Sequence, residues 1–258
     1  MMGIDIHALL NPLMALILPF FRIVACLFFA PVLDNKAFAR RIKAALALAL
    51  SVIIAPLLPH QVTLTEVLSM RTVILIGEQL LWGFFFGMAL QLVFVVLQTA
   101  GHILSMNMGL GMAIINDPVN GSSSTVISQI IYIFCGLLFF IMDAHLLLVT
   151  ILFKGFIYWP IGQAMSQPTL QLIAQSIGWI IASATLIALP TTFVMLIVQG
   201  GFGLLNRVSP TLNLFSLGFP ISMLFGLFCI SMMITNIPGH YLNLTNEILA
   251  KLDAIRMY

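Results

Sequence analysis

Residues 172–205 read LIAQSIGWIIASATLIALPTTFVMLIVQGGFGLL, 34 residues without an aspartate, glutamate, lysine or arginine. As one helix this stretch would be roughly 50 Å long at 1.5 Å per residue, which is more than a helix needs to cross the hydrocarbon core of a bilayer. Pro190 lies in its second half and is expected to break the helix. A stretch of this kind is typical of an integral membrane protein.

The rest of the chain has the same character. Hydrophobic residues make up 61% of the 258 positions and charged residues 7%, against about 25% in a soluble domain, so a water-facing surface could not be covered. Five further apolar stretches are seen, at residues 9–33, 44–58, 72–97, 126–153 and 212–237. The sequence therefore predicts an all-α, polytopic membrane protein of about six apolar helical stretches, some of them bent or broken, in a single domain spanning residues 1–258.

The distribution of charged residues predicts the membrane topology only weakly. The loop at residues 34–43 holds four of the ten lysines and arginines and is expected on the cytoplasmic side, although later loops barely support that assignment. The first apolar run has no signal-peptide features and is expected to be retained. Residues 244–258 read as a short amphipathic helix, which could lie on the membrane, on a partner or in solvent.

Two helical stripes of small and amide side chains are expected to pack against other helices, either of the same chain or of other subunits. On the third stretch the members fall within an arc of about 80° and are Gly83, Gly87, Gln91, Gln98 and Gly101. On the last stretch they are Gly218, Ser222, Gly226 and Cys229.

Four ionisable residues lie inside apolar runs and are expected to be buried: Arg22, Glu78, Asp143 and His145. Each is costly in a bilayer and therefore marks a candidate functional position. Three interpretations remain open: structural pairing of Arg22 with a carboxylate, proton or ion handling, and contact with another subunit. Asp143 and His145 are two residues apart, so they do not share a helix face.

The segment at residues 101–125, GHILSMNMGLGMAIINDPVNGSSST, is the most unusual of the chain. It combines methionines, which adapt to varied shapes, with glycines, which free the backbone, and ends in an Asp117-Pro118 turn signal. Apolar non-helical backbone at membrane depth survives only inside protein or along a cavity. The segment is thus either a surface loop or an element that lines or closes a pore.

Catalytic signatures are missing from the sequence. It contains no HExxH motif, no phosphate-binding loop and no cysteine/histidine metal set. The three cysteines, Cys26, Cys135 and Cys229, lie in apolar runs without metal-like spacing and are expected to be free thiols. We expect no enzyme activity, no cofactor and no metal. The net charge of +2 gives no reason to expect nucleic acid as a partner.

Two long motifs carry a family resemblance. The runs QTAGHILSMNMGLGMAIINDPVNG (98–121) and LLNRVSPTLNLFSLGFP (204–220) resemble the signature of the FliR family, the flagellar export-gate membrane proteins related to the SpaR and YscT proteins of type III secretion. The basic run at residues 40–43, the apolar run to Pro56 and the element at residues 160–162 fall where that family has them. The resemblance extends over essentially the whole chain.

The resemblance implies a gate component in the bacterial inner membrane at the flagellar basal body. It implies a helical hetero-oligomer with FliP and FliQ, neighbours FlhB and FlhA, and unfolded flagellar subunits as cargo. It also implies that the inner loop plugs the closed channel, here through Met106, Met108, Gly109, Leu110, Gly111, Met112, Ala113, Ile114, Ile115, Asp117 and Pro118. Residues 112–115 stand where many relatives carry a phenylalanine-containing run. The competing hypothesis is a small ion-coupled secondary transporter that uses Arg22, Glu78 and Asp143.

Overall fold

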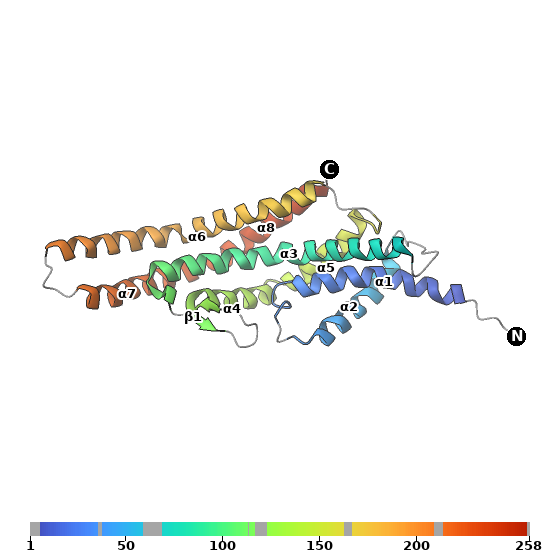
Figure 1. The fold of residues 1–258 in the computed structure, drawn as a ribbon, viewed down its shortest axis with the longest axis horizontal. Coiled ribbons are helices and arrows are strands. Elements are labelled where there is room, and N and C mark those ends of the chain that lie inside the picture. The colour runs from blue at the N-terminus through green and yellow to red at the C-terminus, as the bar shows by residue number, and fades with distance from the viewer. Residues whose placement is uncertain are drawn as a thin grey trace. The chain divides into compact units, whose positions relative to one another are not determined.

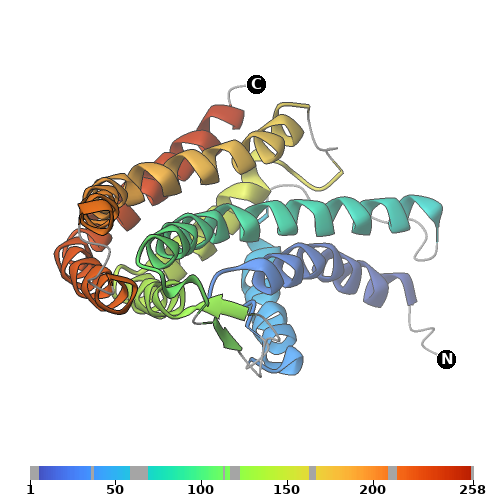
Figure 2. The ribbon, with the colours of Figure 1, turned by 60° about the vertical axis from the view of Figure 1, so that its left-hand side comes forward.

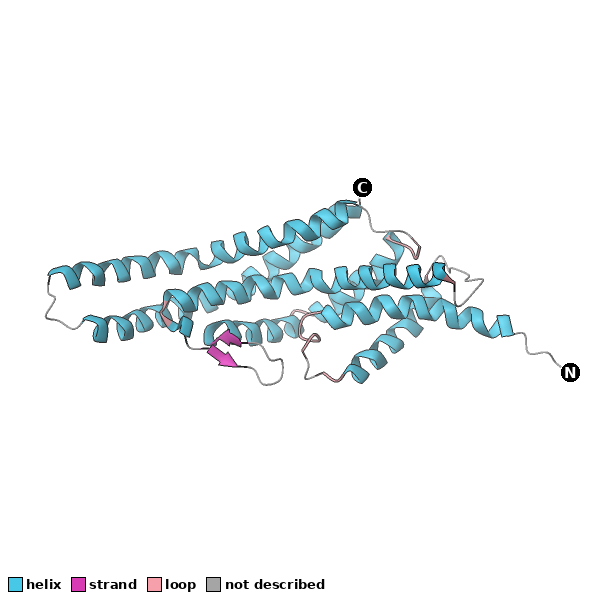
Figure 3. Ribbon diagram, viewed as in Figure 1, coloured by secondary structure: helices cyan, strands magenta, loops and turns pink. Residues whose placement is uncertain are grey.

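The computed structural model describes residues 6–35, 38–58, 69–112, 114–116, 123–162, 167–208 and 214–256, and most of them are helical (Figures 1 and 3). The helices are α1 (Ile6–Phe29), α2 (Arg40–Ile54), α3 (Met70–Asn107), α4 (Val126–Ile141), α5 (Ala144–Tyr158), α6 (Gln167–Val208), α7 (Leu214–Ile234) and α8 (Ile237–Arg256), with short 3-10 turns η1 (Ala55–Leu57) and η2 (Leu110–Met112). The prediction of a helical membrane protein is confirmed, and the term all-α needs one correction, a two-stranded hairpin.

The described residues contain fewer clear membrane-span candidates than the six apolar stretches expected. In the described residues, Met70–Asn107 and Ile173–Val208 are each long and apolar enough to cross a membrane. Two further candidates arise when α4 with α5, and α7 with α8, are each counted as one broken span. The structure thus offers two to four spans, and the count of six is not confirmed.

The chain divides into two compact units whose segments alternate along the sequence. The first unit comprises Met1–Gln91, Met142–Ala174 and Lys251–Tyr258, and the second comprises Leu92–Ile141 and Gln175–Ala250. Each unit has its own aromatic cluster. The prediction of a single domain stays a prediction.

In the first unit, tryptophan rings form the centre of the core. Trp82 of α3 stacks on Trp159, just after α5, with ring centroids 5.2 Å apart, and on Phe86 at 5.8 Å. The α1 and α3 helices meet closely because Gly83 and Gly87 face the backbone of α1, where an added Cβ would overlap the carbonyl oxygens of Arg22 and Cys26. Close backbone approach at glycine is how helices pack when no large side chain intervenes.

In the second unit, Phe94 of α3 is surrounded by two rings of α4 and one of α8. Its centroid lies 5.8 Å from Tyr132, 6.1 Å from Phe139 and 6.1 Å from Tyr241, all in edge-to-face geometry. The α6 and α8 helices run side by side (Figures 1 and 2), and the indole nitrogen of Trp179 donates to Glu247 Oε1 at 2.6 Å.

Helix α6 continues through Pro190, so the predicted break there is wrong. Proline removes one backbone N–H, which leaves the carbonyl of Leu186 without its usual partner. Directly after it, the hydroxyls of Thr191 and Thr192 both donate to the carbonyl of Ala188 at 2.8 Å. Hydroxyl side chains are among the groups that let apolar helices tolerate proline.

The segment at residues 101–125 is less irregular than predicted. Its first seven residues complete α3, and the helix ends only at Asn107. After η2, strand β1 (Ile114–Asn116) pairs antiparallel with β2 (Ser123–Thr125), with Ile114 opposite Thr125. The Asp117-Pro118 turn signal lies between these strands, outside the described residues.

The C-terminal helix is also longer than predicted. Helix α8 begins at Ile237, seven residues before the expected start at residue 244. Its Tyr241, Leu244 and Ile248 side chains are buried within the second unit. One face of this helix therefore packs on its own chain.

Candidate functional site

The C-terminal end of α3 is the most specifically built part of the second unit. The helix ends at Asn107, and Met108 and Gly109 turn the chain away from its axis. The amide of Met108 still donates to Leu104 O and that of Gly109 to Met106 O, both at 3.1 Å. We call residues 107–109 the tip.

Met108 fills a notch in α7. Its side chain is 2% exposed, and it lies directly against Gly226, where an added Cβ would overlap the Met108 thioether. Because glycine leaves this space free, the methionine can insert between the helices. The unbranched, polarizable thioether is well suited to such a gap.

The backbone conformation at position 109 requires glycine. Its φ of +77° lies in the left-handed region, which side chains disfavour. An added Cβ there would also lie 3.1 Å from the ring of Phe219 in α7. The turn that ends α3 therefore depends on glycine.

Asn107 ties the tip to α6. Its side-chain nitrogen donates to Thr192 Oγ1 at 2.7 Å, and its backbone carbonyl accepts from Gln199 Nε2 at 2.7 Å. These polar contacts lie between otherwise apolar helices, where a hydrogen bond has few competitors. The tip is thus held from two sides, by the contact of Met108 with α7 and by the hydrogen bonds of Asn107 with α6.

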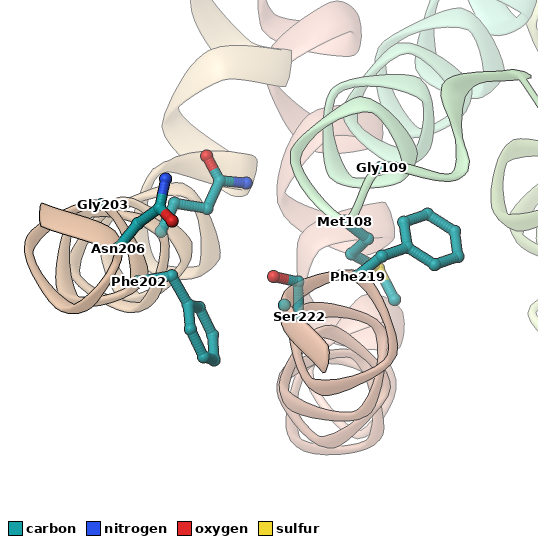
Figure 4. Close-up of a pocket in the computed structure, with 9 residues that line it drawn as sticks. Met108, Gly109, Phe202, Gly203, Asn206, Phe219 and Ser222 are labelled. Carbon is teal, nitrogen blue, oxygen red and sulfur yellow. The ribbon is translucent and has the colours of Figure 1, made fainter. Parts of the chain in front are cut away.

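A cavity of about 530 Å³ opens beside the tip (Figure 4). Besides Met108 and Gly109, its lining includes Gln199, Phe202 and Asn206 from α6, and Gly218, Phe219 and Ser222 from α7. In Figure 4, the α6 residues and the α7 residues face the same space from opposite sides. The cavity therefore joins the two motifs at residues 98–121 and 204–220, which are far apart in the sequence.

The remaining residues of the predicted plug lie on both sides of the tip. Met106 is 57% exposed, whereas Leu110 and Gly111 are half-buried. Ser105 Oγ donates to the carbonyl of Leu110 at 3.3 Å, which draws η2 back toward α3. Met112 ends η2, Ile114 and Ile115 belong to β1, and Ala113, Asp117 and Pro118 lie outside the described residues.

The two small-residue stripes contact different kinds of atoms. Gly83 and Gly87 face α1, and Gln91 Nε2 donates to Asp34 Oδ2 at 3.1 Å. On α7, Gly226 faces Met108, while Gly218 and Ser222 line the cavity.

The buried ionisable residues do not form a cluster in the first unit. Arg22 is fully buried, its Nη1 donates to the carbonyls of Gly155 and Trp159 at 3.2 and 3.0 Å, and its guanidinium lies over Phe156. Cations are favoured there because the carbonyls at the carboxyl end of α5 carry partial negative charge. Arg22 thus binds backbone carbonyls, and within the described part of the chain its predicted pairing with a carboxylate is not seen.

The other three ionisable residues differ in burial. The prediction that these three residues are buried stays a prediction: Glu78 and His145 are half-buried, and Asp143 is exposed in this chain. The reason is local: Asp143 has a left-handed φ of 54° in the break between α4 and α5. Among the described residues no group of three or more histidines, cysteines or acids could hold a metal ion.

Sequence reasoning missed the residues that hold the tip in place. Asn107, Thr192 and Gln199 stand singly in apolar helices, and nothing in the sequence indicated which of them would meet. Their polarity could have marked them as hydrogen-bonding residues, since an amide or hydroxyl inside an apolar stretch requires a partner.

Comparisons with known proteins identify the family of this chain. The model of the family "Bacterial export proteins, family 1" matches residues 13–248, which include both motifs and every tip residue. The chain belongs to this family. The predicted resemblance is thereby confirmed, and the apolar helices indicate a membrane-embedded export component.

Individual relatives extend over nearly the same region. The chain is 31% identical over 231 residues to the flagellar biosynthetic protein FliR of Pectobacterium carotovorum subsp. carotovorum, covering 89% of this chain and 88% of the relative. It is 30% identical over 210 residues to FliR of Escherichia coli (strain K12), covering 81% and 80%. It is 26% identical over 232 residues to the Yop proteins translocation protein T of Yersinia pestis, covering 86% and 88%.

Proposed function

We propose that this chain is a component of the flagellar type III protein export gate. In this proposal it forms, with FliP and FliQ, the channel for unfolded flagellar subunits, and the tip with the following residues helps to close that channel. The observation that carries the proposal is the meeting of the two family motifs at the tip and its cavity.

The chemistry of the tip suits a reversible seal. A conduit for varied unfolded chains should offer no fixed charge, and residues 101–116 contain no lysine, arginine, aspartate or glutamate. Apolar constrictions exclude ions by dewetting when empty. Met108 anchors the segment, whereas the exposed Met106 is available to contact neighbouring chains. This division of roles supports a closing element that is held at one end.

The exposed apolar side chains of α6 and α7 support assembly with other membrane subunits. Large hydrophobic residues are exposed along both helices, among them Phe193, Leu196, Leu204, Leu224 and Phe228. Such surfaces face either lipid or protein partners. We assign FliP and FliQ to this surface, propose FlhB and FlhA as further partners, and place the chain in the bacterial inner membrane at the flagellar basal body.

The transporter alternative gains no support from the described residues. It requires Arg22, Glu78 and Asp143 to handle ions together, yet Arg22 binds the carbonyls of α5 and Asp143 is exposed. Without a shared ionisable site there is no basis for coupling ion movement to a substrate. We therefore retain the export gate rather than the ion-coupled transporter as the proposed function.

A crosslinking experiment tests the proposed channel. A cysteine at Met106 should crosslink to an export substrate stalled in the assembled complex, because this side chain is exposed beside the tip. The control is a cysteine at Met70, which is 76% exposed at the other end of the same helix. Cys229, the half-buried native thiol, is replaced by serine in both variants. Crosslinking at neither position, or equally at both, would contradict the proposal.

Closure is tested separately by ion leakage. Deleting residues 109–113 should raise ion flux across membranes that hold the assembled complex, because the apolar segment no longer fills the channel. Unchanged flux in a complex of normal composition would show that the tip does not close the channel.

A further inference from the structure

Polar side chains link the tip to α6 immediately after Pro190. Asn107 Nδ2 donates to Thr192 Oγ1, and the Thr192 hydroxyl in turn donates to Ala188 O at 2.8 Å. Seven residues along α6, Gln199 Nε2 reaches the carbonyl of the same asparagine. One residue of α3 is therefore bound at two points on α6, and that residue directly precedes Met108.

This arrangement can open at a low cost. When Asn107 leaves, Thr192 keeps its bond to Ala188 O, so no hydroxyl is left without a partner. Gln199 lines the cavity and is exposed, so its amide is not left buried when Asn107 leaves. A buried polar group resists separation strongly only when separation leaves it unsatisfied. Neither α6 group is in that position.

The neighbouring space allows the tip to move. Gly203 of α6 lines the cavity beside the tip, and an added Cβ there would have no atom within 4 Å. On the α7 side, the tip is held by Met108, an unbranched and flexible side chain. Contacts with a methionine and two hydrogen bonds can be exchanged without unfolding either helix.

We propose that Asn107, Thr192 and Gln199 form a releasable latch, in which α6 positions the tip and sets how readily it leaves its seat on α7. The three are positioning residues, since they act through Met108 and Gly109. An effect of the latch on export would rest on the proposed function. The latch itself concerns only how α6 holds the tip.

Hydrogen–deuterium exchange of the assembled complex tests the latch without altering the tip. Thr192→Val keeps the shape of the side chain and removes the hydroxyl, so exchange of peptides covering residues 104–112 should become about three- to tenfold faster. Thr185→Val is the matched control, because the Thr185 hydroxyl on the same helix donates to Ile181 O of its own helix. Equal exchange in the two variants would overturn the latch.

Two further variants separate the latch from a general loss of packing. Thr192→Ser restores a hydroxyl and should return exchange toward the wild-type rate. Asn107→Ala combined with Thr192→Val should loosen the tip no more than Asn107→Ala alone, because both remove the same bond. In all variants peptides from α4 should keep their protection. Additive effects, or exchange that also rises in α4, would count against a local latch.

Ion leakage distinguishes the two proposals. If Thr192→Val speeds tip exchange and also raises leakage, both the latch and the closing role are supported. If it speeds exchange while neither it nor deletion of residues 109–113 raises leakage, the latch stands and the closing role fails. If deletion raises leakage but Thr192→Val leaves exchange unchanged, the closing role stands and the latch fails.

Discussion

Two contacts made by α3 and the tip depend on glycine for opposite reasons. In the first half of α3, Gly83 faces the backbone of α1, where an added Cβ would overlap the carbonyl oxygen of Arg22. Beyond the C-terminal end of α3, Gly226 of α7 faces the flexible side chain of Met108. Backbone cannot yield, whereas the end of a methionine can. The first contact therefore fixes two helices together, and the second provides a seat that can be emptied.

The largest effect is expected at the fixed contact. Gly83→Ala should destabilise the chain by about 3 kcal/mol, at the upper end for overpacking, because neither the Arg22 carbonyl nor α1 can move aside. The measurement is the thermal unfolding midpoint of the purified complex.

Gly77 supplies the control for this substitution. An added Cβ at Gly77 has no atom within 4 Å, and alanine favours helix over glycine, so Gly77→Ala should keep or raise the midpoint. A Gly83→Ala protein as stable as the Gly77→Ala protein would show that α1 and α3 do not meet as described.

An intermediate effect is expected at the seat. Gly226→Ala should cost about 2 kcal/mol, and it should raise ion leakage because the methionine is displaced. The measurements are the unfolding midpoint and the ion flux.

The Met108→Ala substitution tests whether Gly226→Ala acts through the contact between these two residues. Since Met108 and Gly226 are in contact, Gly226→Ala should add little once Met108 has been shortened. Simple addition of the two stability losses would mean that the residues do not share one contact.

The smallest effect on stability is expected at Gly109→Ala. The left-handed φ of +77° makes a side chain there unfavourable by about 1 kcal/mol. Gly162, with a φ of +93° in the first unit, should show a similar loss when changed to alanine. Only Gly109→Ala should alter leakage, because only Gly109 belongs to the tip; leakage from both variants would point to a general effect of instability.

Much of the helical framework could be predicted from the sequence, because an apolar stretch in lipid has few alternatives to a helix. The interior of the third stretch, the small residues at 83 and 87 and the family motifs were all visible there. Pro190 was misjudged because apolar helices of membrane proteins tolerate an internal proline. The hairpin was missed because three-residue strands give no periodic signal.

The candidate site was only partly accessible to such reasoning. Met108 and Gly109 stood out by composition, but the approach of Asn107 to Thr192 and of Met108 to Gly226 depends on tertiary packing. A stripe of small residues indicates close packing without naming the neighbour. For Arg22 a carboxylate was the expected partner, and the carbonyls at the end of α5 took that place.

The alternation of the two units along the sequence bears on how this protein is made. The first unit includes Lys251–Tyr258, and the second includes most of α8, so both draw on residues that follow α7. Domains generally fold during synthesis as their residues emerge from the ribosome. Here neither body can be completed until α8 has emerged, so the earlier segments of both bodies must be kept from aggregating until that helix is available.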